Sequence, residues 1–324
     1  MSSVLVLAEH DRGNLDELSL EALTFGRDLS EQMGVPLHAV IAGEAGRAIA
    51  EGLGEYGVST VHLAAHDSLD DYAPVGWAQA MVELIGRLEP QIVVASGSDR
   101  GSEVMAHAAA TMGLPLAANC IEVTPGEPLQ LTRTRWGGSL LEESKVSGSV
   151  KLLTMSPHAV RAEKAPAPAE AAVEPFTPKL SADDLRVRVV SRVAPEAGKV
   201  ALPDAKVVVG GGRGVGGADG FAALEELARL LGGAVGCSRV VTSAGWRPHT
   251  DQVGQTGTRI APDVYIACGI SGAIQHMVGC KAAKKIIAIN TDRDAPIVQQ
   301  ADYALIGDLH QILPALIAEL RKES

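Results

Sequence analysis

The sequence predicts an α/β protein built from two doubly wound domains, each with a mostly parallel sheet covered by helices. Three observations lead to this prediction. Short apolar runs alternate with longer amphipathic stretches, as expected where strands and helices follow one another in a parallel sheet. The alternation stops in a segment rich in proline and alanine at 165–178, and then starts again. After this restart, glycines and polar side chains gather directly behind the apolar runs, where ligands bind in such sheets.

The first series of elements occupies the N-terminal half of the chain. Apolar runs predict strands, and stretches with apolar residues at helical spacing predict helices. We expect strands at 4–8, 37–42, 61–65 and 92–95, and helices at 15–33, at 72–88 and from the turn at 96–98 to about residue 112. Between 117 and 153 the pattern changes to β-type runs separated by Pro125-Gly126 and Gly137-Gly138, which predicts an antiparallel extension.

The proline-rich segment indicates where the first domain ends. Residues 165–178 contain four prolines and no periodic pattern, so we expect a semi-rigid linker or a draped segment. A polar, β-like run follows at 185–193. We place the boundary behind it, which gives domains at 1–194 and 195–324.

The second series repeats the alternation. We expect strands at 206–209, 264–267, 286–289 and 304–306, and a glycine-rich turn at 210–217. Helices are expected at 219–231, at 272–280, in a short piece after Pro296 and at 309–321. The loops behind these strands are therefore the place to look for the chemistry.

Composition narrows the class of protein. With 324 residues and 46% hydrophobic content the chain can build two cores, and its formal net charge of −11 argues against nucleic acid as a partner. The four cysteines show no CxxC spacing, which predicts buried thiols in a reducing compartment and no metal site. There is no signal-peptide pattern and no apolar stretch long enough for a bilayer, so we expect a cytoplasmic protein without membrane insertion.

The glycine-rich turn is the first candidate binding segment. Gly212, Gly214 and Gly217 match the pattern GxGxxG, in which missing side chains let backbone N–H groups reach a diphosphate at a helix N-terminus. Arg213 would add a charge-assisted contact, although such a turn can also be a simple tight connection. An NAD site needs a carboxylate about 20 residues further on, where this chain has Arg239. The arginine disfavours NAD and leaves NADP open.

Three further segments lie behind the other strands of the second domain. The loop from Gln252 to Gly257 is rich in side-chain hydrogen-bonding groups that suit the edge of a planar heterocycle, although a surface turn is the plainer interpretation. The run from Gly269 to His276 leaves a strand and enters a helix, with Ser271 at the expected N-cap. Asn290 and Asp308, each at the end of a strand, could bind a ribose or adenine, or could simply cap helices.

Together these segments resemble the signature region of electron-transfer flavoprotein alpha subunits. The resemblance rests on the runs Val253-Gly254-Gln255-Thr256-Gly257, Gly269-Ile270-Ser271-Gly272-Ala273-Ile274-Gln275-His276, and Ala288-Ile289-Asn290 followed by Ala295-Pro296-Ile297. Order and spacing fit from about residue 207 to residue 320. The N-terminal domain resembles the family more loosely.

The resemblance implies that the C-terminal domain is Rossmann-like and binds FAD. Arg213 and Ser271 would hold the diphosphate, and Asn290 and Asp308 the adenosine end. Arg239, Gln255, Thr256 and His276 would surround the isoalloxazine, with Thr256 near N5 and His276 near the C2 carbonyl oxygen. The full set of cofactor-binding residues expected is Arg213, Ser238, Arg239, Val253, Gly254, Gln255, Thr256, Gly269, Ser271, Gly272, Ala273, Ile274, Gln275, His276, Asn290, Asp308 and Leu309.

The resemblance also implies an electron carrier rather than an enzyme, with no catalytic residue of its own. Such a chain forms a heterodimer with a smaller beta subunit. It accepts electrons from flavoprotein dehydrogenases, such as the acyl-CoA dehydrogenases of fatty acid oxidation, and passes them singly to a quinone reductase or another acceptor. A bifurcating complex with a second flavin in the partner is a variant within the family.

Two alternatives from other classes remain at this point. A self-contained NAD(P)- or FAD-dependent oxidoreductase would need a substrate pocket with an acid or base, and the sequence offers no such group of residues outside the flavin set. A nucleotide-binding regulatory protein of the universal-stress type is suggested by the N-terminal α/β domain. Bound flavin would argue against the regulatory protein, and colourless ATP binding would favour it.

Overall fold

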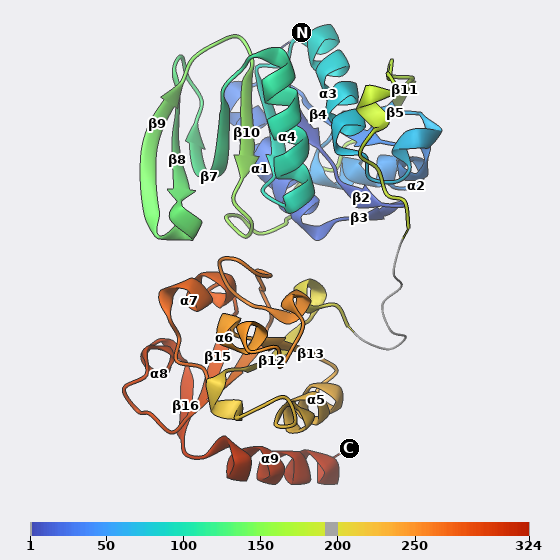
Figure 1. Ribbon diagram of the computed structural model, residues 1–324. Coiled ribbons are helices and arrows are strands. Elements are labelled where there is room, and N and C mark those ends of the chain that lie inside the picture. Colours follow the sequence, from blue (N-terminus) through green and yellow to red (C-terminus); the bar gives the residue numbers. More distant parts are fainter. Residues whose placement is uncertain (1, 192–199, 324) are drawn as a thin grey trace. The chain divides into compact units, whose positions relative to one another are not determined.

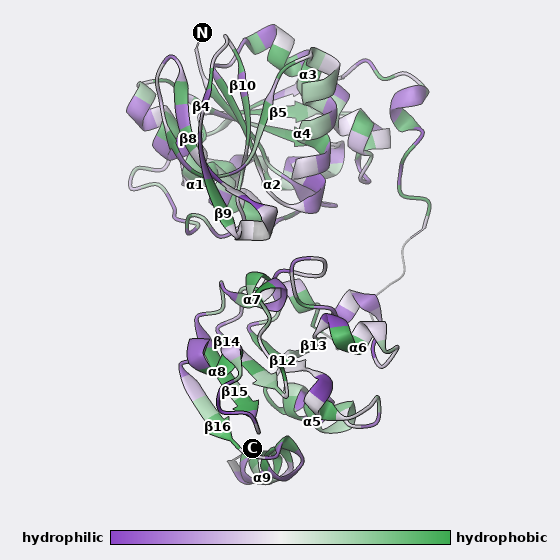
Figure 2. Cartoon of the chain, turned by 60° about the vertical axis from the view of Figure 1, so that its left-hand side comes forward, coloured by the Kyte–Doolittle hydropathy of each residue, from purple (hydrophilic) through white to green (hydrophobic). Residues whose placement is uncertain are grey.

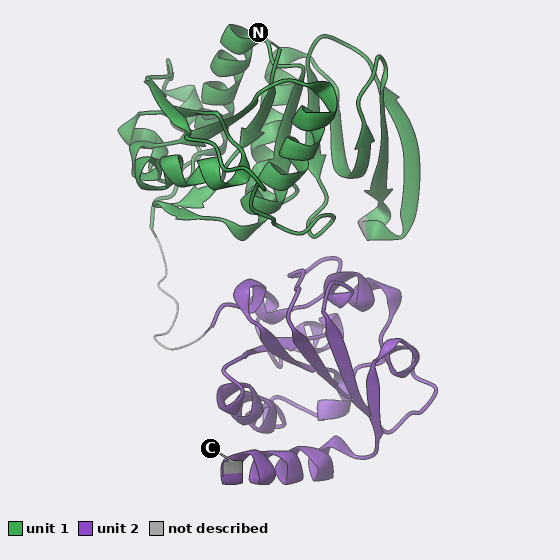
Figure 3. Cartoon of the chain, turned by 180° about the vertical axis from the view of Figure 1, so that it is seen from behind, with its two compact units in different colours: residues 1–192 green, residues 193–324 purple. Residues whose placement is uncertain are grey.

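The chain forms two compact units, residues 1–192 and residues 193–324 (Figure 3). The computed structural model describes residues 2–191 and 200–323. The expected domain boundary between residues 194 and 195 lies outside these described residues. Within them, no helix is long and apolar enough to cross a membrane.

In its described residues, unit 1 is built on a nine-stranded sheet in the order β11-β5-β4-β1-β6-β10-β7-β8-β9 (Figure 1). Neighbouring strands from β11 to β7 are parallel, whereas β8 pairs antiparallel with both β7 and β9. The strands are β1 (Val4–Leu7), β4 (Leu37–Ala42), β5 (Thr60–Ala64), β6 (Ile92–Ser96), β7 (Leu116–Thr124), β8 (Leu129–Arg135), β9 (Leu140–Val146), β10 (Lys151–Met155) and β11 (Ala172–Phe176), with a small hairpin of β2 (His10–Asp11) and β3 (Asn14–Leu15).

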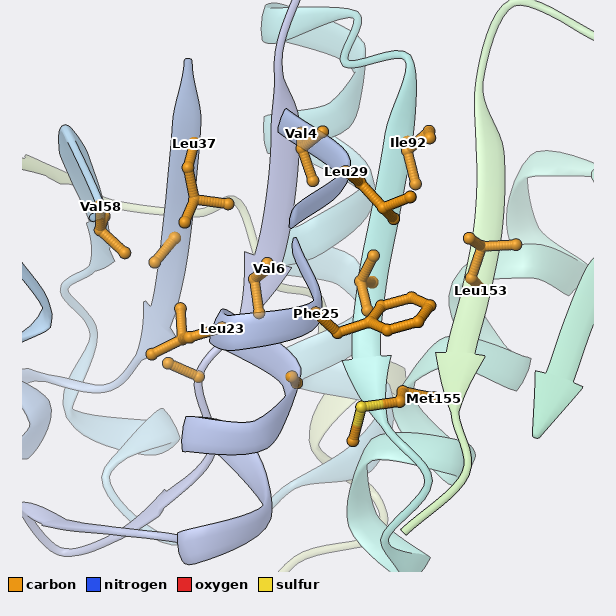
Figure 4. Packing of buried hydrophobic residues seen from close by; sticks show 14 of the residues in the cluster. Val4, Val6, Leu23, Phe25, Leu29, Leu37, Val58, Ile92, Leu153 and Met155 are labelled. Carbon is orange, nitrogen blue, oxygen red and sulfur yellow. The ribbon is translucent and has the colours of Figure 1, made fainter. Parts of the chain in front are cut away.

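Helices bury both faces of this sheet. They are α1 (Glu17–Met33), α2 (Arg47–Ala50), α3 (Pro74–Leu88) and α4 (Asp99–Met112). Side chains of β1 alternate between the two cores: Val4 and Val6 join one cluster, and Leu5 and Leu7 join the other. Figure 4 shows α1 packed on the first face, with Phe25 among the strand side chains. This burial on both faces explains why β1 is a continuous apolar run.

Our expectations for unit 1 need correction in three places, and the first two concern the sheet. Strand β10, which we placed in the antiparallel extension, lies between β6 and β7 and is parallel to both. The segment 165–178, expected as a semi-rigid linker or a draped segment, contains a strand, because β11 adds to the sheet edge as the parallel neighbour of β5. Pro175 is tolerated there because an edge strand leaves one row of backbone groups outside the ladder.

The run at 185–193 does not form the expected β-structure in its described part. A 3₁₀ turn ends at Leu185, and residues 186–191 are not in a strand. Alternating residues alone cannot make a strand, because its backbone groups need a neighbouring strand to bond with. Residues 192 and 193 of the run lie outside the described residues.

Unit 2 contains, in its described residues, a five-stranded parallel sheet in the order β13-β12-β14-β15-β16. Most of the strand β15 in this sheet is coloured hydrophobic in Figure 2. The elements are β12 (Val207–Gly211), α5 (Phe221–Leu230), β13 (Ala234–Cys237), α6 (Arg239–Ser243), β14 (Val264–Cys268), α7 (Ile274–Cys280), β15 (Lys285–Asn290), α8 (Pro296–Gln300), β16 (Tyr303–Ile306) and α9 (Leu309–Glu323).

The strand order of unit 2 predicts where a ligand binds. From β12 the chain goes first to β13 on one side and then to β14 on the other, so its direction of winding reverses there. In open parallel sheets the ligand crevice lies outside the carboxyl ends of the strands at such a switch point. In unit 2 this is where the loops behind β12 and β14 meet.

Candidate functional site

A cavity of about 530 Å³ opens at the carboxyl ends of the unit 2 strands. Its lining combines guanidinium groups, hydroxyls and amides with a few apolar side chains, as is typical of cofactor sites. The lining residues are Arg213, Ser238, Arg239, Val240, Ser243, Gln252, Val253, Gly254, Gln255, Thr256, Gly269, Ile270, Ser271, Ala273, Gln275 and His276.

A second cavity of about 270 Å³ borders the first. Both are lined by Arg213, Gly269 and Ser271. The remaining lining of the second cavity is Gly214, Asn290, Thr291, Asp292, Ala295, Gly307, Asp308 and Leu309. Of our expected residues, only Gly272 and Ile274 line neither cavity.

The glycines behind β12 serve a purpose that differs from our expectation. The N–H groups of Gly212 and Gly214 donate to the carbonyls of Cys268 and Gly269, at 2.9 and 3.0 Å, so they are not free to bind a phosphate. A Cβ on Gly212 would lie 2.2 Å from the Gly269 oxygen. The GxGxxG motif therefore locks two loops together at the switch point, and α5 begins only at Phe221.

Two arginines supply positive charge to the cavity. Arg213 follows β12, and Arg239 is the first residue of α6, behind β13. Both side chains are exposed, and neither forms an ion pair with another described residue. Ser238 stands at the N-cap of α6 without making a side-chain cap bond. Arg239 occupies the place where an NAD site would carry a carboxylate.

The loop at 252–258 is held against α7 by close backbone contacts. The N–H of Gln255 donates to the carbonyl of Gln275 at 2.7 Å. Gly279 has room for no side chain, since its Cβ would lie 2.3 Å from the nitrogen of Gly254. Gln255 and Thr256 are exposed at the cavity. The polar loop is thus a fixed wall of the cavity and not a loose surface turn.

His276 is buried and hydrogen-bonded to a residue that we did not anticipate. Its Nε2 lies 2.8 Å from the hydroxyl of Tyr265, which is fully buried in β14. Its Nδ1 is buried and has no partner among the described residues. Burial lowers the pKa of His276 to about 4, and the nearby carbonyl of Val253 opposes that shift without forming a hydrogen bond of good geometry. The imidazole is therefore neutral near pH 7.

The start of α7 differs from our expectation. The helix begins at Ile274 with Ala273 at the N-cap, so Ser271 does not cap it. The carbonyl of Ser271 instead accepts a hydrogen bond from the N–H of Ile297 at 3.1 Å. Gly272, with φ of 81°, packs against the same residue. This left-handed turn delays the helix by two residues.

Asn290 and Asp308 already have partners within the chain. Asn290 donates from Nδ2 to the carbonyl of Ile270 at 2.8 Å, and its Oδ1 accepts from the N–H of Asp292 at 3.0 Å. Asp308 accepts from the N–H of His310 at 2.9 Å, as a cap of α9 does. The capping role that we considered holds for Asp308, whereas Asn290 closes a turn. Both still line the second cavity.

Several lining residues were absent from our expected set. Gln252 stood in the polar loop, so its sequence context could have found it. Val240 and Ser243 follow Arg239 on α6, and they were missed because a helix at 239–243 was not expected. Tyr265 lines neither cavity but bonds to His276, and it gave no signal because an aromatic residue inside an apolar strand is ordinary core.

Comparison with known proteins gives the family of the chain. Residues 4–181 match the family model described as electron transfer flavoprotein domain, and residues 201–281 match the electron transfer flavoprotein FAD-binding domain. The chain belongs to the electron transfer flavoprotein alpha subunit family. Unit 2 is accordingly its FAD-binding domain.

Similar curated proteins cover almost the whole chain. The electron transfer flavoprotein subunit alpha of Thermoanaerobacterium thermosaccharolyticum is 34% identical, over 98% of this chain and 98% of its own length. The subunit alpha of Bacillus subtilis is 35% identical, over 98% and 97%. Protein FixB of Clostridium saccharobutylicum is 36% identical, over 98% and 96%. The designation as an alpha subunit implies a second, beta subunit.

The cavities of unit 2 fit FAD on chemical grounds. Two adjoining spaces suit an elongated ligand with a ring at each end, and Arg213 stands where they meet. Guanidinium groups bind phosphate oxygens through charge-assisted hydrogen bonds. Around the larger space, Thr256 and Gln255 offer exposed hydrogen-bonding groups, and the apolar Val253 and Ile270 offer contact for a ring.

Proposed function

We propose that this chain is the alpha subunit of a heterodimeric electron carrier that accepts electrons from flavoprotein dehydrogenases, such as acyl-CoA dehydrogenases, and passes them singly to a quinone reductase or another acceptor. The observation that supports it best is the pair of adjoining cavities, whose walls carry Arg213 and Arg239, two arginines without an ion pair to another described residue. When bound, FAD supplies the redox chemistry, and the protein binds it and sets its electrostatic environment.

Each part of the site has a proposed role. Arg213 and Ser271 contact the diphosphate, because they line both cavities. Asn290 and Asp308 face the adenosine end, each through the hydrogen-bonding capacity that its internal bonds leave free. Arg239, Gln255, Thr256 and His276 surround the ring that accepts the electrons. The guanidinium of Arg239 stabilises the negative charge that an added electron brings to a partly desolvated site.

The first experiment is reconstitution. The chain is co-expressed with its beta subunit, and its FAD content and its reduction by a reduced acyl-CoA dehydrogenase are measured. About one FAD on unit 2 and electron transfer to a one-electron acceptor are expected. A complex that cannot be loaded with FAD would overturn the proposal. A second flavin in the partner would identify the bifurcating variant.

Arg239→Gln tests the electrostatic role. Removal of the positive charge should make the first one-electron reduction potential more negative by roughly 60 mV, which corresponds to a tenfold change in a one-electron equilibrium. Arg259→Gln is the matched control, because Arg259 is exposed and lines neither cavity. Equal shifts in both variants would refute a specific role for Arg239. Spectroelectrochemical titration gives both potentials.

A further inference from the structure

Two threonines are connected through a buried glutamine in the wall of the larger cavity. The Thr242 hydroxyl lies 2.8 Å from Oε1 of Gln252, and Nε2 of Gln252 donates to the hydroxyl oxygen of Thr256 at 2.9 Å. Thr256 is exposed at the cavity, and Gln252 is 2% exposed. Thr242 lies outside the lining. A hydrogen-bonded path thus leads from α6 to the cavity.

Backbone hydrogen bonds and burial hold Gln252 in this path. Its carbonyl accepts from the N–H of Thr258 at 2.7 Å, and its N–H donates to the carbonyl of His249 at 3.0 Å. A Cβ on Gly257 would lie 2.2 Å from the same carbonyl oxygen. Turning the terminal amide over exchanges its donor and acceptor ends.

The orientation of this amide determines what Thr256 can offer a ligand. A hydroxyl has one hydrogen and two lone pairs. When Thr256 accepts from Nε2, its own hydrogen is free to point into the cavity. When the amide is turned over, Thr256 donates to Oε1 and presents only lone pairs to the cavity.

Thr242 can stabilise either orientation. Its hydroxyl also lies 3.0 Å from the carbonyl of Arg239, so its single hydrogen has two acceptors within reach. If it donates to Gln252, the amide faces Thr256 with its NH₂ group. If it donates to Arg239, its lone pairs can accept from the NH₂ group, and the amide turns over.

We propose that Gln252 is a positioning residue that sets whether the Thr256 hydroxyl donates to or accepts from the bound cofactor, and that Thr242 controls Gln252 from outside the cavity. The proposal rests on the FAD site proposed above. A hydroxyl that can change its role suits a flavin ring, whose edge carries acceptors when oxidised and an added N–H donor after full reduction.

A double-mutant cycle tests this coupling in the heterodimer. Thr242→Val and Thr256→Val remove one hydroxyl each with little change in volume, and Thr242→Ser and Thr256→Ser retain it. The dissociation constant of FAD is measured for the apo-complex of every variant, together with both one-electron potentials and the melting temperature without FAD.

We expect Thr242→Val to weaken FAD binding roughly three- to tenfold, which is the effect of about one net hydrogen bond. In the Thr256→Val background the same substitution should change the dissociation constant less than about twofold, because the path then ends at Gln252. Both serine variants should behave like the wild type. The effect of Thr242→Val on the two one-electron potentials should likewise be smaller in the Thr256→Val background.

If the wild-type complex binds FAD but the effects of Thr242→Val and Thr256→Val are additive, the coupling is overturned and the proposed function stands. A wild-type complex that binds no FAD would overturn both. If Thr242→Val lowers the melting temperature of the apo-complex too far for titration, Gln252→Met replaces it in the cycle. Additivity between Gln252→Met and Thr256→Val would then overturn the proposal.

Discussion

At the scale of the residue, the surroundings of His276 determine the protonation state of its ring. Gly210 in β12 makes room for the hydroxyl of Tyr265, since a Cβ there would lie 2.3 Å from that oxygen. Tyr265 in turn bonds Nε2 of His276 at 2.8 Å. Burial then holds the pKa of the imidazole near 4, well below that of an exposed histidine. Three elements therefore fix one neutral ring beside the cavity.

This environment predicts how the stability of unit 2 depends on pH. Between pH 6.5 and 4 the unfolded chain binds a proton at His276 and the native chain does not, so native stability falls as the pH falls. The loss amounts to about 3 kcal/mol once the pH has fallen through the folded pKa. His276→Gln should lack this loss. Urea unfolding of the apo-protein at pH 7 and pH 4.5 measures the difference.

The comparison must be made between variants, because other groups titrate in the same range. Burial raises the pKa of Glu9 in unit 1 to about 7. Its contribution to native stability therefore falls as the pH rises, which is opposite to the effect of His276. His310→Gln, at an exposed position of unit 2, is the control. If His276→Gln and the wild type lose equal stability on acidification, the histidine is not buried in its neutral form.

At the scale of the element, the loops behind β12 and β14 interlock through glycine. Gly212 and Gly214 approach Gly269 so closely that no side chain fits between them. Gly217, the third glycine of the motif, has nothing within 4 Å of a built Cβ. The three positions of one sequence motif therefore have different physical requirements.

Alanine at the two ends of the motif should affect the stability of unit 2 very differently. Gly212→Ala forces a methyl group against the Gly269 carbonyl, and we expect a loss of about 3 kcal/mol in the free energy of unfolding of unit 2, with loss of FAD binding. Gly217→Ala should be within about 0.5 kcal/mol of the wild type. Denaturant unfolding and FAD titration of both variants decide this. Equal destabilisation would contradict the interlock.

The elements also show what the sequence could and could not predict. Strands β12, β14 and β15 lie within two residues of their expected positions, because a strand buried on both faces is a plain apolar run. The place of β10 could not be foreseen, since pairing partners are set by tertiary packing and not by the strand's own residues. The expected Ser271 cap failed because the left-handed Gly272 turn comes before the helix.

The site, too, was predictable from the sequence in part. Most expected residues line the cavities, because the strand order brings the loops behind the strands together. The partners of those residues were not visible in the sequence. Tyr265 is thirteen residues from Gln252 and eleven from His276, and only the folded structure shows that its hydroxyl bonds to the histidine. Networks of this kind depend on distances that spacing along the chain does not encode.

At the scale of the whole molecule, each unit has its own sheet and its own pair of cores. The two described cavities at the candidate site are lined by residues of unit 2 alone. A ligand stabilises the structure that it binds, by an amount that grows with its concentration over its dissociation constant. FAD binding should therefore affect the local opening of the two units differently.

Hydrogen exchange on the intact chain tests this division. FAD at about one hundred times its dissociation constant should raise the free energy of opening of unit 2 by about 2.7 kcal/mol, which slows its most protected amides roughly a hundredfold. Amides of β14 and β15 should show the effect, and those of β1 and β6 should not. Riboflavin, which lacks the diphosphate that Arg213 and Ser271 are proposed to contact, is the control and should protect unit 2 less. Equal protection of both units by FAD would mean that unit 1 unfolds together with unit 2, in spite of its separate cores.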